Sequence, residues 1–272
     1  PRSTLFPYTT LFRSTGANAL TVSGPGTVRL DTASTFTGAV AIADGGRLRV
    51  VNNTELGNPA NTISLTNGGA LDLIGTSYGA ADALVHQLGN PILGSGRSIN
   101  IGTGGGTISV VSYTNLGNRY ALTGTNPLTG SGMLTKAGFG YLNLHSSTSF
   151  SGGITVPYQS GALELRGTGA LPNVTSLEIG QNSYLIVDNQ NGQGPRQFAS
   201  VNNNDRINNS ASILLKGAQV IYRARNAAGQ TAETFGATTI GEGFSYLRHE
   251  VSGQGSDITI SNLIRPRSEE RV

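Results

Sequence analysis

The stretch Gly140-Tyr-Leu-Asn-Leu144 is followed by Phe150-Ser-Gly-Gly-Ile-Thr-Val156 and then by Ser160-Gly-Ala-Leu-Glu-Leu165. The first and last of these segments alternate polar and apolar residues, which is typical of short strands buried on one face. Glycine and serine separate the segments, so the chain is expected to turn sharply between them. Because a single pair of such short strands is only marginally stable, each segment should pair with equivalent segments elsewhere in the chain.

The same alternation recurs along the whole chain. Turn-forming residues bound the segments, for example at Asp44-Gly-Gly46, Asn67-Gly-Gly69 and Asn191-Gly192, and Asn and Gly tolerate the left-handed backbone conformation that such turns require. Only residues 80–88 resemble a short helix, which would end at Gly89-Asn90-Pro91. The pattern predicts strands at 26–30, 39–43, 47–51, 62–66, 70–73, 107–111, 141–144, 162–166, 184–188, 212–215, 219–222 and 257–260.

A longer repeat relates the first part of the chain to the stretch quoted above. Phe36-Thr-Gly38 corresponds to Phe150-Ser-Gly152, and Gly46-Arg-Leu48 corresponds to Gly161-Ala-Leu163. Degenerate repeats of short strands and turns predict stacked units rather than one closed globule. Each strand would then pair with its equivalent one rung later.

The expected fold is therefore an all-β, right-handed parallel β-helix, or β-solenoid, incomplete at both ends. Val, Ile, Leu and Phe at alternate positions would stack into a continuous core, while Gly and Asn would occupy the corners. The two ends would expose unpaired strand edges, and the polar caps that normally cover such ends are not evident in the sequence. We expect these exposed ends to allow end-to-end association.

The composition fits a neutral protein with many turns. Charged residues make up 12% of the chain, about half the usual share, and 39 of the 272 residues are glycine. The glycines follow no Gly-X-Y period, which excludes collagen, and a patterned 37% of hydrophobic residues argues against disorder. There is no cysteine, which excludes a disulfide framework and thiolate metal sites, and which suits passage through a periplasm in unfolded form.

Both ends of the chain are expected to be foreign to the fold. Residues 1–14, PRSTLFPYTTLFRS, resemble a translated sequencing-library adapter, and residues 267–272, RSEERV, resemble the translation of the opposite adapter strand. A signal peptide is the alternative for the first segment, but Pro7 interrupts the apolar stretch and no small-residue cleavage site follows it. We expect both end segments to be disordered, and residues 15–266 to form one repeat domain.

The charge of the body argues against two classes of partner. Four arginines and two glutamates lie in the end segments, so the formal net charge falls from +3 to +1 without them. A nucleic-acid or anionic-membrane partner requires clustered Lys and Arg, and the body contains no long basic run. The apolar runs are also shorter than the roughly 18 residues of a membrane-spanning helix. We therefore expect no nucleic-acid partner and no membrane insertion by this fragment.

Residues 128–167 resemble the autotransporter-associated β-strand repeat. That repeat combines a Gly-x-Leu-x-Leu strand, an aromatic-Ser/Thr-Gly-Gly-x-Thr-Val segment and a Gly-x-Leu-x-Leu return, which residues 140–144, 150–156 and 160–165 match. The first copy departs from the pattern, because Ala39 replaces the second glycine of the middle segment. The resemblance implies a secreted or surface-exposed β-helical passenger, often an adhesin or stalk, that is exported through the outer membrane.

A β-helical carbohydrate-active enzyme, either a glycan lyase or a hydrolase, is the alternative function. Glycoside hydrolysis needs two carboxylates about 5 to 10 Å apart. Outward positions on neighbouring rungs would bring Glu164 near Glu178 or Asp188, although solvated residues on strand faces are the simpler interpretation. The acidic residues considered are Asp31, Asp44, Glu55, Asp72, Asp82, Glu164, Glu178, Asp188, Asp205, Glu233, Glu242, Glu250 and Asp257.

No motif predicts a catalytic, cofactor or metal site. His86, His145 and His249 are far apart in the sequence, and a metal site needs several convergent ligands. Residues 102–106 lack the following Lys of a phosphate loop and are interpreted as a turn. Tyr222-Arg-Ala-Arg225 places two cations on one strand face, which indicates a solvated edge.

Binding is expected to use surfaces rather than a motif. Residues 188–209 form a candidate interaction loop, with a tolerated insertion as the simpler interpretation. We predict a non-catalytic extracellular or cell-surface passenger, acting as a scaffold or adhesin, with no cofactor. Its expected partners are surface glycans or other cell-surface proteins. A polysaccharide-binding module is a further alternative. The sequence alone does not align the tyrosines that are available for stacking on a polysaccharide, which are Tyr78, Tyr113, Tyr120, Tyr141, Tyr158 and Tyr184.

Overall fold

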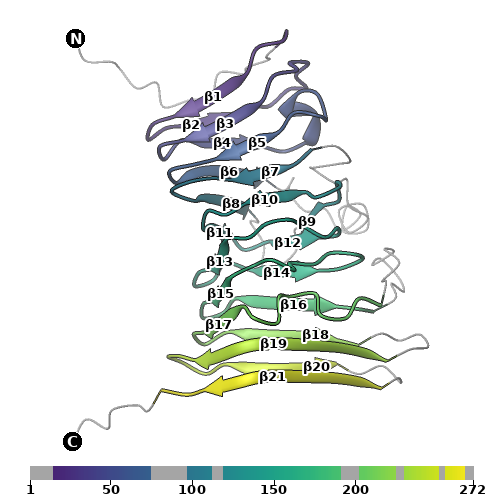
Figure 1. The fold of residues 1–272 in the computed structure, drawn as a ribbon. Helices are drawn as coiled ribbons and strands as arrows, with labels where there is room; N and C mark the ends of the chain where they lie inside the picture. The colour runs from purple at the N-terminus through teal and green to yellow at the C-terminus, as the bar shows by residue number, and fades with distance from the viewer. Residues whose placement is uncertain are drawn as a thin grey trace, which may run out of the picture.

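The protein is a stack of parallel strands arranged along one axis, with the first and last strands at opposite ends of the stack (Figure 1). The structure is a computed structural model that describes residues 15–74, 97–111, 119–190, 202–224, 230–250 and 255–266. The end segments 1–14 and 267–272, and the helix expected at 80–88, lie outside these described residues.

Three sheets form the sides of the stack. The first sheet contains β1 (Leu20–Ser23), β3 (Val40–Ala43), β5 (Ile63–Leu65), β7 (Ile99–Ile101) and β10 (Leu128–Gly130). The second contains β2 (Thr27–Arg29), β4 (Arg47–Val50), β6 (Gly69–Ile74), β8 (Gly106–Val111), β11 (Leu134–Ala137), β13 (Gly153–Val156), β15 (Ser176–Ile179), β17 (Ser212–Leu215), β19 (Thr231–Ile240) and β21 (Ser256–Ile264). The third contains β9 (Arg119–Leu122), β12 (Tyr141–Leu144), β14 (Ala162–Leu165), β16 (Tyr184–Asp188), β18 (Gln219–Arg223) and β20 (Tyr246–Glu250).

Every strand pairing among the described residues is parallel and joins strands one rung apart. The predicted all-β parallel solenoid is therefore confirmed, and a strand forms at each of the twelve predicted positions. Within the described part of the chain, the one helix is the short 3-10 helix Asn53–Leu56. Neighbouring strands lie about 4.8 Å apart, so the ten strands of the second sheet extend about 43 Å along the axis.

The sequence repeat occupies two different pairs of sheets. In the first copy the strands β2, β3 and β4 belong to the second, first and second sheets, whereas β12, β13 and β14 of the later copy belong to the third, second and third. Between the copies, two successive rungs, β7 to β9 and β10 to β12, each place one strand in every sheet, while the rungs before and after them place strands in two. Across these two rungs the repeat moves from the first and second sheets to the second and third.

Apolar side chains from alternate strand positions form one continuous core along the axis. The two phenylalanines that the repeat aligns, Phe36 and Phe150, are both fully buried in this core. Lys136 interrupts it, because it follows Ile108 in a core-facing row and is also fully buried. Its ammonium group donates to the carbonyl oxygens of Gly138, Gly140 and Ser160, and burial lowers the pKa of this amine to about 7.

The corners depend on residues with a left-handed backbone. Asp44 and Asn67 have φ angles of 52° and 47°, and their side chains are joined by a 3.1 Å hydrogen bond between successive corners. Gly161 has a φ of 63°, and a Cβ atom there would collide with the carbonyl oxygens of Phe139 and Gly140 on the previous rung. The corners therefore restrict both the backbone conformation and the space between rungs.

Replacing Gly161 with alanine should destabilise the protein strongly, whereas the matched change Gly26→Ala should not. Gly26 has no positive φ, and a Cβ there meets nothing within 4 Å. The left-handed backbone alone costs a non-glycine residue about 1–3 kcal/mol, before the collision is counted. Thermal unfolding followed by circular dichroism measures both variants, and equal melting temperatures would contradict this account of the corners.

Candidate functional site on the third sheet

The outer face of the third sheet carries the densest set of buried charges among the described residues. Its inward side chains, such as Leu163 and Leu185, belong to the core, and the residues between them point outward. Register places Asp188, Arg223 and Glu250 side by side in one outward row. Glu164 and Asp188 are 0% and 1% exposed, so the chemistry of this face depends on their partners.

Arginine side chains neutralise these carboxylates. The Nη1 atom of Arg223 lies 3.5 Å from Oε1 of Glu164 and 3.3 Å from Oδ2 of Asp188, while its Nε donates to Glu250 across 2.8 Å. Arg119 donates to Glu164 across 2.5 Å, and Arg166 lies 3.5 Å from Asp188. We call Arg119, Glu164, Arg166, Asp188, Arg223 and Glu250 the arginine–carboxylate network.

This network corrects two expectations. The structure brings Glu164 and Asp188 to one face, but it places Glu178 on the second sheet, where it binds Lys216 across 2.6 Å. Arg223 is 9% exposed, so the interpretation of residues 222–225 as a solvated edge is wrong for it, and Arg225 lies outside the described residues. The solvated interpretation is also wrong for Glu164, Asp188, Asp72, Glu55 and Glu233, which are all buried.

Two of these other buried acids hold the scaffold together. Asp72 on the second sheet accepts from Arg47 and Arg49 of the previous rung. The carboxylate of Glu233 accepts the backbone N–H groups of Arg206 and Ile207, at 2.9 and 3.1 Å, and burial raises its pKa to about 7. Both arrangements link neighbouring rungs.

The two described histidines lie in different surroundings. Burial, with Arg166 and Arg206 nearby, lowers the pKa of His145 to about 4, so this ring is neutral at physiological pH. His249 is exposed, and its Nε2 lies 2.5 Å from Oγ of Ser256. His86 lies outside the described residues, and within them no group of three or more His, Asp or Glu could hold a metal ion.

The structure aligns tyrosines that the sequence could not. Tyr141, Tyr184 and Tyr246 occupy the same row of the third sheet on alternate strands. Tyr120 instead lies in the core, Tyr158 is exposed at a corner, and Tyr78 and Tyr113 lie outside the described residues. Tyr246 was not singled out from the sequence, because its strand, β20, lacks a clear apolar alternation.

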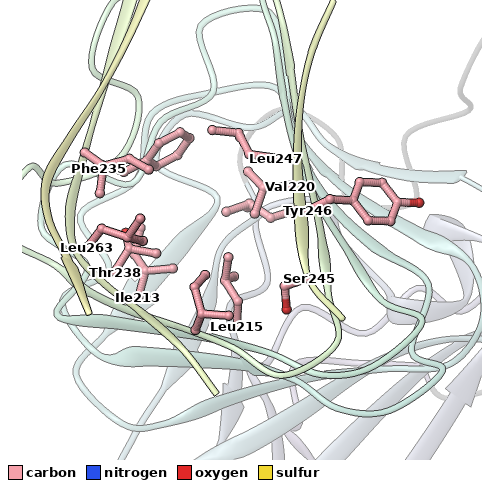
Figure 2. A pocket seen from close by; sticks show the side chains of 12 residues that line it. Ile213, Leu215, Val220, Phe235, Thr238, Ser245, Tyr246, Leu247 and Leu263 are labelled. Carbon is pink, nitrogen blue, oxygen red and sulfur yellow. The ribbon is translucent and has the colours of Figure 1, made fainter. Parts of the chain in front are cut away.

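An apolar cavity of about 160 Å³ lies at the C-terminal end of the stack, between strands of the second and third sheets (Figure 2). Phe235, Leu215 and Val220 line it, together with Leu247 and Leu263, which are 41% and 61% exposed. It continues the solenoid core and holds few polar groups that could orient a ligand.

In the described residues, no helix has the length and apolar character needed to cross a membrane.

Removal of Arg223 should destabilise the protein, because Glu164, Asp188 and Glu250 would lose a shared cationic partner. Breaking a buried ion pair from one side typically costs about 3–5 kcal/mol, so Arg223→Met should lower the free energy of unfolding by roughly this amount. Lys216→Met is the control, because Lys216 makes an exposed pair with Glu178. Denaturant titration compares the two, and a similar small effect for both would show that the network carries no stability.

The comparisons with known proteins agree with this architecture. The family model for the passenger-associated transport repeat matches residues 20–50 and 134–165, which span β1 to β4 and β11 to β14. An autotransporter adhesin of Brucella suis biovar 1 (strain 1330), named BmaC, is 32% identical over 203 residues, which cover 74% of this chain and 6% of that protein. No solved structure matches the chain. This chain is a parallel solenoid that carries two such repeats, and 74% of its residues align with an autotransporter adhesin. It is therefore an autotransporter passenger-like protein.

Proposed function

We propose that this chain is a non-catalytic section of a cell-surface, adhesin-like passenger. The two matched repeats and the alignment with an adhesin autotransporter support this proposal. The chain spans only 6% of the length of that relative, so the surface location and the adhesive role are proposed here from a part of a much longer protein.

The arginine–carboxylate network is the observation that carries the non-catalytic part of the proposal. A general acid or base must reach a proton on the substrate by a hydrogen bond. Glu164 and Asp188 are instead buried against Arg119, Arg166 and Arg223, and they have almost no surface at which a sugar could meet them. The network therefore supports a role in joining rungs.

The stacked architecture supports a scaffold role. Each rung buries its apolar side chains against the rungs on either side, and stability accumulates from such neighbour contacts. The chain also contains no cysteine, so no disulfide would form before the chain crosses an outer membrane. These properties suit a passenger that leaves the cell unfolded and then forms an extended shaft.

The surface location is tested by placing the chain between a signal peptide and an autotransporter translocator domain. We expect protease added to intact cells to cleave the chain, because it should be exported and displayed. The same fusion without its signal peptide is the control and should be protected inside the cell. Accumulation of the chain in the periplasm, while the translocator exports its own passenger, would contradict the proposal.

The alternative of a glycan-degrading enzyme is favoured by one observation, the placement of Glu164 and Asp188 on one face. Because Arg223 contacts both carboxylates, we expect the purified chain to release no reducing ends from a panel of plant and algal polysaccharides. Turnover that Glu164→Gln or Asp188→Asn abolishes, in variants that still melt cooperatively, would establish an enzyme instead.

A further inference from the structure

Aromatic side chains gather along the corner between the second and third sheets. Phe139 and Tyr158 lie in two successive turns of this corner and Phe244 lies three turns further along; they are 48%, 58% and 81% exposed. Tyr246 is 39% exposed just beyond it, and these four are all of the large exposed aromatic residues in the described part of the chain. Together with the half-buried Tyr141 and Tyr184, we call Phe139, Tyr141, Tyr158, Tyr184, Phe244 and Tyr246 the aromatic edge.

Register gives the aromatic edge a regular spacing. Along one row of the third sheet, Tyr141 is followed by Ala162, Tyr184, Gln219 and Tyr246 on consecutive strands. Adjacent strands lie about 4.8 Å apart, so the tyrosines recur every 9.6 Å or so along the axis. This step is about the length of one disaccharide unit in an extended polysaccharide. The small and polar residues between the rings leave the ring faces separate.

The rings are held in place before any ligand binds. Tyr141 and Tyr184 pack against a buried apolar cluster of Ala162, Ile186 and Ile221. The guanidinium of Arg119 lies 4.1 Å from the ring centre of Tyr141, and the rings of Phe244 and Tyr246 are 5.8 Å apart. Groups that are already ordered lose little entropy on binding, which favours affinity.

The corner beneath these rings is also fixed. The N–H of Gln159 donates to the carbonyl oxygen of Gln181 across 2.9 Å, and the N–H of Asn182 donates to that of Gly217 across 3.2 Å. These bonds tie three successive corners together. The aromatic edge therefore belongs to the rigid stack and keeps its spacing.

The charges that border the aromatic edge already have partners. Lys216 binds Glu178 at the corner across 2.6 Å, Arg248 binds Glu250 across 3.0 Å, and Arg119 binds Glu164. Glu242 adds one exposed negative charge to the corner. A polyanion would thus find no unpaired cation at this place in the described structure, whereas an uncharged ligand is complementary to it.

We propose that the aromatic edge binds a neutral, extended polysaccharide lying parallel to the axis of the solenoid. The apolar CH faces of its pyranose rings stack on Tyr141, Tyr184 and Tyr246, with one disaccharide unit for every two rungs. Gln219 lies between the last two tyrosines in this row; its amide nitrogen donates to the Tyr184 hydroxyl across 3.4 Å, and its amide oxygen accepts from a sugar hydroxyl. This inference rests on the proposed function only in that surface display would bring the edge to such glycans.

Binding is tested with the full purified chain by isothermal titration and by affinity electrophoresis. The neutral ligands are hydroxyethylcellulose and cello-oligosaccharides, and polygalacturonate is the anionic comparison. We expect binding to the neutral polymer, little binding to polygalacturonate, and higher affinity for a hexasaccharide than for a disaccharide. The three tyrosines extend over about 19 Å, so a disaccharide reaches only one of them.

Substitutions separate ring stacking from folding. Tyr184→Ala should weaken binding by about tenfold or more, as for an aromatic anchor, while Tyr184→Phe keeps the ring and should retain affinity. Leu263→Ala is the matched control, because Leu263 is 61% exposed on β21 of the second sheet, outside the row of tyrosines. Melting curves verify that all three variants fold.

Three results would overturn the inference: no binding to the neutral ligands, a preference for polygalacturonate, or equal affinity of Tyr184→Ala and Leu263→Ala. These outcomes are independent of the export assay. A chain that is displayed on cells but fails to bind glycan would refute the aromatic edge as a binding site and leave the proposed function intact.

Discussion

The parallel pairing of each strand with the strand one rung away is the constraint on which the whole structure depends. It satisfies the backbone hydrogen bonds of a strand outside its own rung, so the side chains of successive rungs must stack in register. Leucine therefore follows leucine in the core, and a corner must leave room for the corner above it, as Gly161 does beneath Gly140. The same pairing places arginine over carboxylate on the outer faces, where Arg223 lies between Asp188 and Glu250.

Corners also explain how charged groups can lie inside so narrow a core. The turn at residues 138–140 and the next at 157–161 direct carbonyl oxygens toward the interior, and the ammonium group of Lys136 takes three of them as acceptors. Arg206 uses the same solution, since its guanidinium donates to the carbonyl oxygens of Gly167 and Gly169. Backbone carbonyls thus serve as acceptors for both buried cations, and Arg206 donates in addition to the side chain of Asn189.

Alternation and turn residues were enough to predict the fold class and twelve strands, because both signals are local. Strands with weak alternation were missed, such as β11, which contains Lys136, and β20, whose residues are mostly exposed. The sequence could not show whether Glu164 lies near Asp188 or near Glu178, because the answer depends on the sheet to which each strand belongs. The aromatic edge could not be predicted from the sequence either, because its residues are neighbours only across different rungs.

The move of the repeat across the two three-strand rungs, β7 to β9 and β10 to β12, has a consequence for how such a shaft presents its surface. One repeat sequence faces one direction before these rungs and a direction one side further round after them. A change in the length of one connection that adds or removes one side of the stack would therefore turn the downstream repeats about the long axis without altering any repeat. The direction in which a binding surface faces can then change independently of its chemistry, and copies of one surface can lie at different angles around the long axis.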